Sequence, residues 1–297
     1  MRDGLSRALS ARGWRLAARN PAVVHIQVGG SVSHRALADV ERRRARGARV
    51  VVTLQDLDHP DLPDDPAADA RLAELIGRAD ALSAVSVPLA RAARRRFGRR
   101  WAVVGNGVDE GGAGRKARRD GATILAASRL APYKGIDLLL MAFAALAARR
   151  PRARLLILGR DFQGGHARRL ARALGLSRRV RFAGELPAPR VRACMRRARL
   201  FVFPSRRETW GMALMEALAC AAPCLTARVG AAAGLRSGRD ALVFKPGDLG
   251  ALTRGLSRLW DDAALRRRLS AAGPRVAARR SWTACAARCE RLYRGRA

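Results

Sequence analysis

The stretch Glu208-Thr-Trp-Gly-Met-Ala-Leu-Met-Glu216 places two carboxylates eight residues apart across a predicted strand-to-helix turn. An apolar segment, Leu200–Phe203, precedes it and ends at Pro204, while helix formers follow from Met212. At such a turn, free main-chain N–H groups and the helix dipole favour an anion, and Gly211 lets a ligand approach the main chain. Two carboxylates beside an anion site suit a phosphorylated, hydroxyl-rich ligand such as a nucleotide sugar. The alternative is an exposed helix start with two solvated glutamates.

Short apolar runs alternate with helical patterns along almost the whole chain. The predicted strands are Ala22–Val28, Arg49–Leu54, Ala81–Ser86, Trp101–Val104, Thr123–Ala127, Arg154–Leu158, Val180–Phe182, Leu200–Phe203, Cys224–Thr226 and Ala241–Phe244. The helical patterns between them include Ala36–Arg46, Ile136–Arg149, Ala167–Leu174, Gly211–Ala221 and Leu249–Trp260. This alternation predicts an α/β protein with parallel sheets covered by helices on both faces. The glycine-rich, charged segment 105–121 is typical of a linker between two such units.

The composition allows two domains and argues against a nucleic-acid-binding protein. A chain of 297 residues can form two hydrophobic cores. The net charge is +35, and all but three of the 59 basic residues are arginine, scattered over predicted helix faces without interleaved aromatic residues. We therefore expect no specific nucleic-acid recognition, but weak attraction to acidic lipid head groups or phosphates.

The termini and the cysteines indicate a cytoplasmic protein. No secretory signal opens the chain, and the longest apolar stretch, Leu138–Ala148, is too short to span a bilayer. Five cysteines, an odd number, are typical of a reducing compartment. The pairs Cys220/Cys224 and Cys285/Cys289 have a spacing that zinc sites use, but buried core positions are the favoured interpretation, and we predict no metal site.

Polar residues follow four strands of the second predicted unit. Ser128, Arg129 and Lys134 follow the first, Gly159-Arg160-Asp161 the second, Gly184-Glu185 the third, and the two-glutamate turn the fourth. In open parallel sheets, ligands bind at the carboxyl ends of the strands, so these residues should converge on one rim. Arg129 and Lys134 bracket a tight turn and could both reach one diphosphate. A solvated loop carrying two charges is the alternative.

In this order, the motifs resemble the donor half of family 4 glycosyltransferases, the retaining enzymes of the GT-B fold. The segment Ser128-Arg-Leu-Ala-Pro-Tyr-Lys-Gly135 is similar to the family's Gly-Arg-Leu…Lys-Gly segment, and Glu208 to Glu216 matches its Glu-x7-Glu motif. Val180-Arg-Phe-Ala-Gly184 resembles a strand end of the family, and Asn106-Gly-Val-Asp109 resembles the turn that closes its first domain. The likeness extends over nearly the whole chain from about Pro21.

The resemblance implies two facing Rossmann-like domains, of which the N-terminal one is truncated. The expected parts are a shortened acceptor-side domain at 1–112, a nucleotide-sugar-binding domain at 113–280, and a C-terminal helix at 281–297 that packs back on the first domain. The implied reaction moves a hexose from a nucleotide-diphosphate sugar to a lipid carrier, a polysaccharide or a small molecule, with retention and without metal or cofactor. A bacterial enzyme of polysaccharide biosynthesis, at the inner face of the cell membrane through its cationic helices, is the expected setting.

The resemblance also assigns roles to residues. Arg129 and Lys134 would neutralise the departing diphosphate, and Glu208 would hold the donor sugar with the main-chain amides of Trp210, Gly211 and Met212. Glu216 would bind the ribose. Leu186, just past Gly184, lies where the family reads the base, and Gly159 belongs to the turn that follows the second strand of this unit. The expected catalytic residues are Arg129, Lys134 and Glu208.

The first domain departs from the family pattern. We expect the initial βαβ portion of the family to be absent, and Gln55 stands where the family often carries a histidine. The segment Gly230–Gly234 lacks the family's glutamate. These departures leave open an alternative, a catalytically impaired protein that binds nucleotide sugar or a protein partner. The triplet Asp56-Leu57-Asp58 is interpreted as an acidic loop rather than a metal site, and His25, inside an apolar strand, as a core residue rather than a base.

Overall fold

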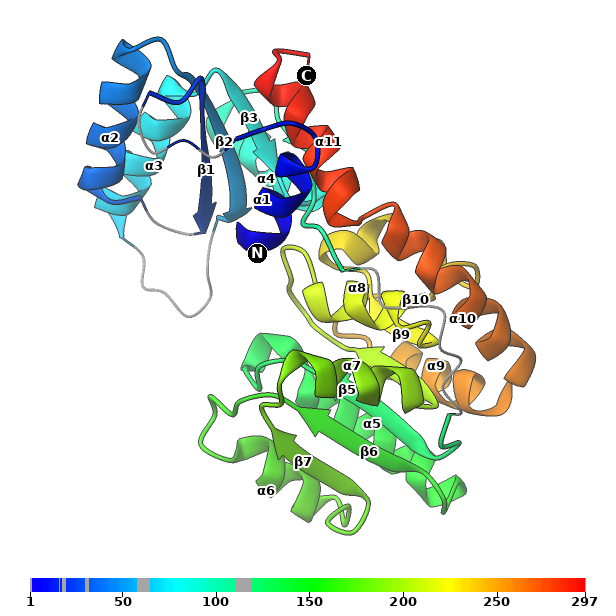
Figure 1. Cartoon of the computed structure of the whole chain (residues 1–297). Helices are drawn as coiled ribbons and strands as arrows, with labels where there is room; N and C mark the ends of the chain where they lie inside the picture. The colour runs from blue at the N-terminus through cyan, green and yellow to red at the C-terminus, as the bar shows by residue number, and fades with distance from the viewer. Residues whose placement is uncertain are drawn as a thin grey trace. The chain divides into compact units, whose positions relative to one another are not determined.

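The computed structural model describes residues 2–15, 17, 20–29, 32–57, 65–109 and 119–296. The chain divides into two compact units, one formed by Met1–Gly107 with Arg280–Ala297 and the other by Val108–Arg279 (Figure 1). Each unit contains a parallel sheet with helices against it, so the predicted α/β class with two Rossmann-like domains is confirmed. Among the residues described, no helix is long and apolar enough to cross a membrane.

The first unit is built on a four-stranded parallel sheet in the order β1-β2-β3-β4. Its strands are β1 (Val23–Gly29), β2 (Arg49–Asp56), β3 (Ala81–Ala84) and β4 (Ala102–Val103). Its helices are α1 (Arg2–Ser10), α2 (His34–Ala45), α3 (Pro66–Arg78), α4 (Val87–Phe97) and, from the far end of the chain, α11 (Trp282–Tyr293). The apolar face of α11 packs on this sheet, because Cys285, Cys289 and Leu292 lie in one cluster with Val51 and Val104.

The second unit is built on a six-stranded sheet in the order β10-β9-β8-β5-β6-β7, with every neighbouring pair parallel. The strands are β5 (Thr123–Ala127), β6 (Arg154–Leu158), β7 (Val180–Gly184), β8 (Leu200–Phe203), β9 (Cys224–Ala227) and β10 (Leu242–Phe244). The α-helices are α5 (Ile136–Arg149), α6 (His166–Ala173), α7 (Ala188–Arg197), α8 (Met212–Ala219), α9 (Leu249–Asp261) and α10 (Ala263–Ala278). Two short 3-10 helices, η1 (Pro132–Lys134) and η2 (Gly230–Gly234), complete it.

The strand order of this sheet reverses between β5 and β8. From β5 the chain moves outward through β6 to β7, and then returns to the other side of β5 to form β8. The connections that leave β5 and β8 therefore turn toward opposite faces of the sheet. In open α/β sheets, ligands bind in the crevice at such a reversal, outside the carboxyl ends of the strands. The fold thus places the loops after β5 and β8 at a ligand-binding position.

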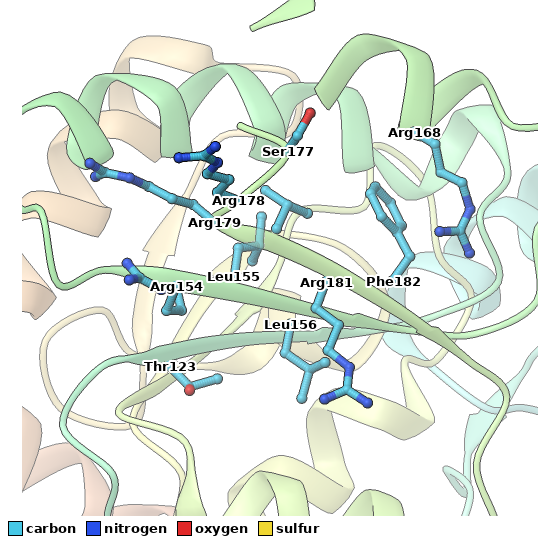
Figure 2. Close-up of a pocket in the computed structure, with 11 residues that line it drawn as sticks. Thr123, Arg154, Leu155, Leu156, Arg168, Ser177, Arg178, Arg179, Arg181 and Phe182 are labelled. Atoms are coloured by element: carbon cyan, nitrogen blue, oxygen red, sulfur yellow. The ribbon is translucent and has the colours of Figure 1, made fainter. Parts of the chain in front are cut away.

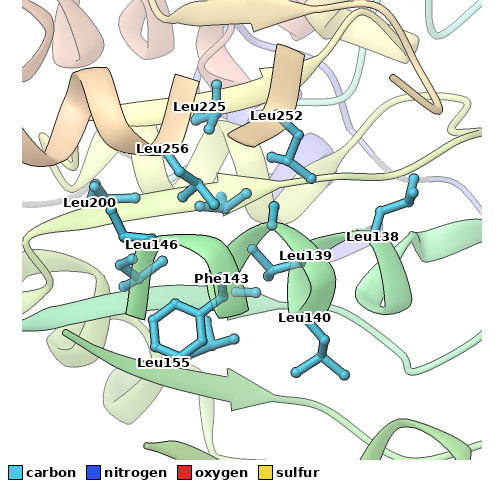
Figure 3. Packing of buried hydrophobic residues seen from close by; sticks show 14 of the residues in the cluster. Leu138, Leu139, Leu140, Phe143, Leu146, Leu155, Leu200, Leu225, Leu252 and Leu256 are labelled. Carbon is cyan, nitrogen blue, oxygen red and sulfur yellow. The ribbon is translucent and has the colours of Figure 1, made fainter. Parts of the chain in front are cut away.

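The core of the second unit is centred on α5, which is apolar around most of its circumference. Leu139, Leu140 and Phe143 are fully buried in one cluster with Leu155 of β6 and Leu256 of α9 (Figure 3). Because α5 lies between the sheet and another helix, it needs apolar residues on more than one face. Burial of this helix fixes the position of the turn that precedes it.

The predicted strands and the helical patterns named between them agree with the observed elements within two residues at each end, whereas the C-terminal helix predicted at 281–297 is shorter, since α11 ends at Tyr293. The helix Ile136–Arg149 and three strands, Thr123–Ala127, Arg154–Leu158 and Leu200–Phe203, have the predicted bounds. The linker predicted at 105–121 lies partly outside the described residues, which resume at 119. Short buried strands and amphipathic or apolar helices carry distinct periodicities, which explains the agreement.

The substitution Leu139→Ala should destabilise the second unit by about 2–5 kcal/mol, because it leaves a cavity between α5, the sheet and α9. Urea unfolding followed by tryptophan fluorescence would measure this loss, since Trp260 of α9 lies in the same cluster. Leu249→Ala is the matched control, because Leu249 is exposed and should change the free energy of unfolding by less than about 0.5 kcal/mol. Equal effects of the two substitutions would contradict the assigned packing.

Candidate active site

A lysine–glutamate pair joins the two loops at the strand-order reversal. Lys134 Nζ, at the end of η1 after β5, lies 2.5 Å from Glu208 Oε2 in the loop after β8. Both side chains are largely shielded, with 10% and 15% of their surface exposed. A nearly buried ammonium is stable only with a charged or hydrogen-bonding partner. The predicted meeting of these two charges is therefore present in the geometry.

A close main-chain approach places Lys134 against the β8 loop. Gly135, the next residue, has φ +66°, and a Cβ built on it would lie 2.3 Å from the carbonyl oxygen of Pro204. Only glycine combines this left-handed conformation with so short an approach. The Lys-Gly dipeptide therefore brings the two loops into contact, and α5 begins directly after it.

Arg206, in the loop after β8, links the same two loops through hydrogen bonds and acts as a clamp between them. Its guanidinium donates to both carboxylate oxygens of Asp137 in the first turn of α5, at 2.7 and 2.6 Å, and to the carbonyl of Pro132 at 3.0 Å. Its main-chain N–H donates to the carbonyl of Tyr133 at 2.8 Å. Burial opposes ionisation of Asp137, yet the hydrogen bonds from Arg206 hold the pKa of that carboxyl below its usual value. The clamp fixes the turn that presents Lys134.

Tyr133 connects the two predicted cations. Its hydroxyl accepts a hydrogen bond from Arg129 at 2.7 Å, and the Lys134 ammonium lies 5.0 Å from the centre of its ring. Arg129 is exposed and also lies 5.9 Å from the ring centre of Phe162, whose side chain is 56% exposed. Arg129, Tyr133, Lys134 and Glu208 thus form one connected cluster, whose positive members suit an anionic ligand.

Gly159 lies where three loops of the rim meet. With φ +130°, it passes so close to the β5 loop that a Cβ would lie 1.8 Å from the carbonyl oxygen of Ser128. The Ser128 N–H donates to Leu158, and the Gly159 N–H donates to Gly184 at 2.7 Å. The loops after β5, β6 and β7 are thereby hydrogen-bonded to one another. Gly159 is needed because any side chain at this position would prevent the β5 and β6 loops from approaching each other.

The start of α8 supplies main-chain donors near Glu208. Gly211 is the N-cap residue with φ +96°, and no side chain caps the helix. A Cβ on Gly211 would lie 3.5 Å from Glu208 Cγ, which places Glu208 beside this helix start. The first amides of an uncapped helix attract anions and hydroxyl oxygens. The positions of Trp210, Gly211 and Met212 therefore fit the roles predicted for their amides.

Three buried polar atoms around the reversal lack a hydrogen-bond partner among the described residues. They are Ser128 Oγ after β5, Ser205 Oγ after β8, and Trp210 Nε1 before α8. Most buried polar atoms in folded proteins are paired, because an unpaired one costs about 1–3 kcal/mol. Their grouping at one rim is typical of a site that is completed by a ligand or by water.

Glu216 and Leu186 belong to α8 and to the connection after β7. Glu216 is half-buried in the second turn of α8; burial raises the pKa of its carboxyl, the charge of Arg192 opposes this shift, and Asp109 adds to it. A carboxyl in such surroundings gains from hydroxyl donors of a ligand. Leu186 is half-buried in the connection after β7, two strands away from β5. Both occupy the predicted side of the sheet.

Tyr133 and Arg206 are the site residues that sequence reasoning missed. Tyr133 lies inside the motif that carries Arg129 and Lys134, but its spacing alone gave it no role. Arg206 stands in Arg206-Arg207, one of many arginine pairs in this chain, so nothing in the sequence distinguishes it. Its function as a clamp depends on contacts with residues about 70 positions earlier.

Residues singled out in the first unit have structural partners. Gln55 Oε1 accepts a hydrogen bond from Asn106 at 2.9 Å. His25 lies 2.7 Å from both Tyr293 Oη and Thr53 Oγ1, as expected of a core histidine. Asp56 accepts from the N–H of Leu57, whereas Asp58 lies outside the described residues.

The cysteines occupy mainly core positions. All five are free, and the four in the two spaced pairs are buried, while Cys194 is partly exposed. Within the described ranges, no group of three or more histidines, cysteines or carboxylates is placed to hold a metal ion. The interpretation of these pairs as core cysteines agrees with their burial.

Removing both members of the central pair should cost less than the sum of the two single losses. Glu208→Gln or Lys134→Met alone should destabilise the protein by about 3 kcal/mol, since each leaves a shielded charge without its partner. In the double variant the loss should be smaller than the sum, with a coupling of about 1–3 kcal/mol in a double-mutant cycle of denaturant unfolding. Strict additivity would show that the contact contributes nothing.

The stability of the first unit should fall as acid is added. Burial lowers the pKa of His25 to about 4, whereas an unfolded histidine titrates near about 6.5. The unfolded chain therefore binds a proton that the folded chain excludes, and the free energy of unfolding should decrease from about pH 6.5 to about pH 4. His25→Gln should flatten this dependence in urea unfolding at several pH values. His166→Gln, at an exposed position of α6, should leave it unchanged; identical slopes in both variants would contradict the assignment.

Comparisons with known proteins show the family to which the chain belongs. The sequence model of the family described as "Glycosyl transferases group 1" matches residues 113–276, more than half of the chain. A relative from Catenulispora acidiphila, named D-inositol 3-phosphate glycosyltransferase 2, is 35% identical over 224 residues, which cover 66% of this chain and 52% of that protein. A relative from Thermomonospora curvata, named D-inositol 3-phosphate glycosyltransferase, is 31% identical over 205 residues, covering 64% and 48%. The chain spans about half the length of these curated relatives.

Solved structures show the same fold. The Anabaena protein HepE, solved in complex with UDP, matches with a TM-score of 0.77 at 19% identity over 98% of this chain and 82% of that one. Sucrose-phosphate synthase from Thermosynechococcus elongatus matches with a TM-score of 0.73 at 23% identity, covering 98% and 76%. The fold is that of GT-B glycosyltransferases, and the resemblance to family 4 is confirmed. This chain belongs to the glycosyl transferases group 1 family.

Proposed function

We propose that the second unit binds a nucleotide-diphosphate sugar and that the protein transfers the hexose to an acceptor with retention of anomeric configuration. The observation that supports this most is the connected cluster of Arg129, Tyr133, Lys134 and Glu208 at the strand-order reversal. It combines cations for a diphosphate with a carboxylate for sugar hydroxyls. The UDP in the HepE complex supports the nucleotide part of this proposal by analogy.

In the proposed reaction, the bond between the anomeric carbon and the diphosphate oxygen breaks, and its electron pair leaves on the diphosphate. Arg129 and Lys134 would stabilise that charge, the part that a metal ion plays in other transferases, so the reaction would need no metal or cofactor. The acceptor hydroxyl would attack from the same face, and its proton would pass to the departing phosphate oxygen. Fixed cations of this kind are effective because they need no rearrangement as the charge develops.

The remaining predicted residues would orient the donor. Glu208 and the amides of Trp210, Gly211 and Met212 would bind sugar hydroxyls, since α8 starts beside Glu208 without a side-chain cap. Glu216 would bind the ribose, and Leu186 would contact the base. Gly159 would shape the rim by letting the β5 and β6 loops approach. Arg206 would act as a positioning residue, because it bonds to the turn that carries Lys134 and to Asp137 in the first turn of α5.

The acceptor is proposed from the names of the relatives and from charge. Several relatives are named as D-inositol 3-phosphate glycosyltransferases, so a phosphorylated cyclitol is one small acceptor to test, beside a lipid carrier or a growing polysaccharide. The many arginines on helix surfaces would favour peripheral contact with an acidic membrane at the cytoplasmic face.

A second candidate is a protein that binds nucleotide sugar without transferring it. The observation that favours it is Gln55, which stands where the family often carries a histidine. Its side-chain amide does not titrate and so cannot act as an acid or a base, and its Oε1 accepts a hydrogen bond from Asn106. Donor binding by the second unit would persist in such a protein. Sugar transfer to any acceptor would separate this candidate from the enzyme.

Lys134→Ala should lower donor hydrolysis and transfer by about 10²–10³-fold, because it removes one fixed charge from the departing diphosphate. Release of UDP or GDP from a set of nucleotide sugars would measure turnover, and thermal shift would measure binding. In the wild type, a donor at about 100-fold its Kd should add about 2.7 kcal/mol of stability. Lys245→Ala removes the same charge from an exposed position and serves as the control. Wild-type turnover by Lys134→Ala would refute the assignment.

A further inference from the structure

One of the two cations at the proposed donor site is exposed. Lys134 is largely shielded and paired with Glu208, whereas Arg129, in the loop after β5, is exposed. An exposed arginine samples many rotamers, and ordering it when a ligand binds costs conformational entropy. A fixed charge stabilises a departing group best when it is in place before the negative charge develops. The contacts that hold Arg129 therefore bear on the proposed reaction.

Tyr133 supplies a hydrogen-bond partner for Arg129. The Arg129 guanidinium donates to Tyr133 Oη at 2.7 Å. Tyr133 lies in η1 and is half-buried, and its main-chain carbonyl accepts from the Arg206 N–H at 2.8 Å. This main-chain bond joins η1 to the loop after β8. The fold therefore fixes the phenol group that Arg129 contacts.

Phe162 supplies a second contact for Arg129. The centre of its ring lies 5.9 Å from the Arg129 guanidinium and 5.3 Å from that of Arg160. The residue is 56% exposed, so its ring is available at the surface rather than packed in the core. The face of an aromatic ring attracts a guanidinium, although at exposed positions this attraction is weaker than a hydrogen bond to a charged group. Phe162 is therefore the weaker of the two contacts.

The loop that carries Phe162 is ordered by main-chain bonds. The Phe162 N–H donates to the Leu130 carbonyl at 3.2 Å, and the Leu130 N–H donates to the Arg160 carbonyl at 2.8 Å. The Asp161 carboxylate accepts from two main-chain N–H groups of the same loop, at 2.8 and 3.0 Å. Leu130 follows Arg129 directly in the chain. These bonds therefore keep the Phe162 loop beside the segment that carries Arg129.

Arginines elsewhere in this unit do not converge in this way. A cavity of about 620 Å³ at the amino edge of the sheet is lined by five arginines. Figure 2 shows Arg181 pointing away from Arg178 and Arg179, so these three side chains do not face one ligand. Arg129 differs because two aromatic residues from ordered segments contact its guanidinium.

We propose that Tyr133 and Phe162 are positioning residues, which hold the Arg129 guanidinium in place for a diphosphate. Tyr133 also stands between the two cations, since its hydroxyl holds Arg129 while its ring centre lies 5.0 Å from the Lys134 ammonium. Each residue acts through Arg129 and needs no contact with the reacting atoms. The inference rests on the donor part of the proposed function, because Arg129 has this role only where a diphosphate binds.

Tyr133→Phe tests the first contact, because it removes only the phenol oxygen and keeps the ring beside Lys134. With the nucleotide sugar that the wild type hydrolyses fastest, kcat should fall about tenfold, since Arg129 loses a charge-assisted hydrogen bond. KM should stay within about twofold, because the fixed charge acts mainly as the diphosphate departs. In an Arg129→Met background, the same substitution should change kcat by less than about twofold. An unchanged kcat, or an equal loss with and without Arg129, would overturn the role of Tyr133.

Tyr293→Phe is the matched control. It removes the phenol oxygen from the other tyrosine of the chain, which belongs to the first unit, and should leave kcat unchanged. A loss equal to that of Tyr133→Phe would show a general effect of losing a tyrosine hydroxyl.

Phe162→Leu tests the second contact. It should lower kcat about two- to fivefold while Arg129 is present, in keeping with an exposed cation–π contact. Phe162→Tyr keeps the ring and should restore the wild-type kcat. Equal kcat values for the leucine and tyrosine variants would overturn the role of Phe162.

Isothermal titration of the full chain with sodium pyrophosphate repeats the cycle without a nucleotide and without turnover. Tyr133→Phe should weaken binding about tenfold when Arg129 is present and less than about twofold in the Arg129→Met background. If no nucleotide sugar is hydrolysed but this coupling is present, the proposed transfer fails and the positioning role stands. If the coupling is absent from both cycles, the positioning role fails even where the wild type hydrolyses its donor.

Discussion

The ion pair between Lys134 and Glu208 is the contact on which the rest of the candidate site depends. It joins the loop after β5 to the loop after β8, the two strands between which the sheet reverses its order. Gly135 permits the approach, and Arg206 ties the same two loops through Asp137 and two carbonyls. Since α5 is buried on several sides, the turn before it cannot move without disturbing the core. The packing of α5 therefore fixes the position of the Lys134 charge relative to Glu208.

Much of this arrangement could be predicted from the sequence. Thr123–Ala127 and Ile136–Arg149 have clear periodicities, and their observed bounds equal the predicted ones. The rule that ligands lie at the carboxyl ends of parallel strands then brings Arg129, Lys134 and Glu208 together without any coordinates. Gly159 was placed at the same rim by the same rule. The steric reason for it, that a Cβ at this position would lie 1.8 Å from the Ser128 carbonyl oxygen, needs the fold.

Other parts of the site could not be predicted, because they arise from contacts between distant residues in a chain where arginine is everywhere. Arg206 and Arg207 are equivalent by sequence, yet Arg206 holds Asp137. Arg154 and Arg181 belong to the arginines that are scattered in the sequence, whereas the register of β5, β6 and β7 places both on one face of the sheet. Similarly, Gln55 was recognisable as a departure from a family pattern, but its hydrogen bond to Asn106 was not.

The main-chain bonds between the loops after β5, β6 and β7 have a consequence for ligand selection. Ser128 donates to Leu158 and Gly159 to Gly184, so the rim continues the ladder of the sheet beyond its strands. A ligand that enters here meets backbone that is already ordered, and little conformational entropy is lost on association. Selectivity among ligands then depends on how well their polar groups match binding partners whose positions are fixed. A ligand that does not match gains little affinity, because the rim does not adjust its shape.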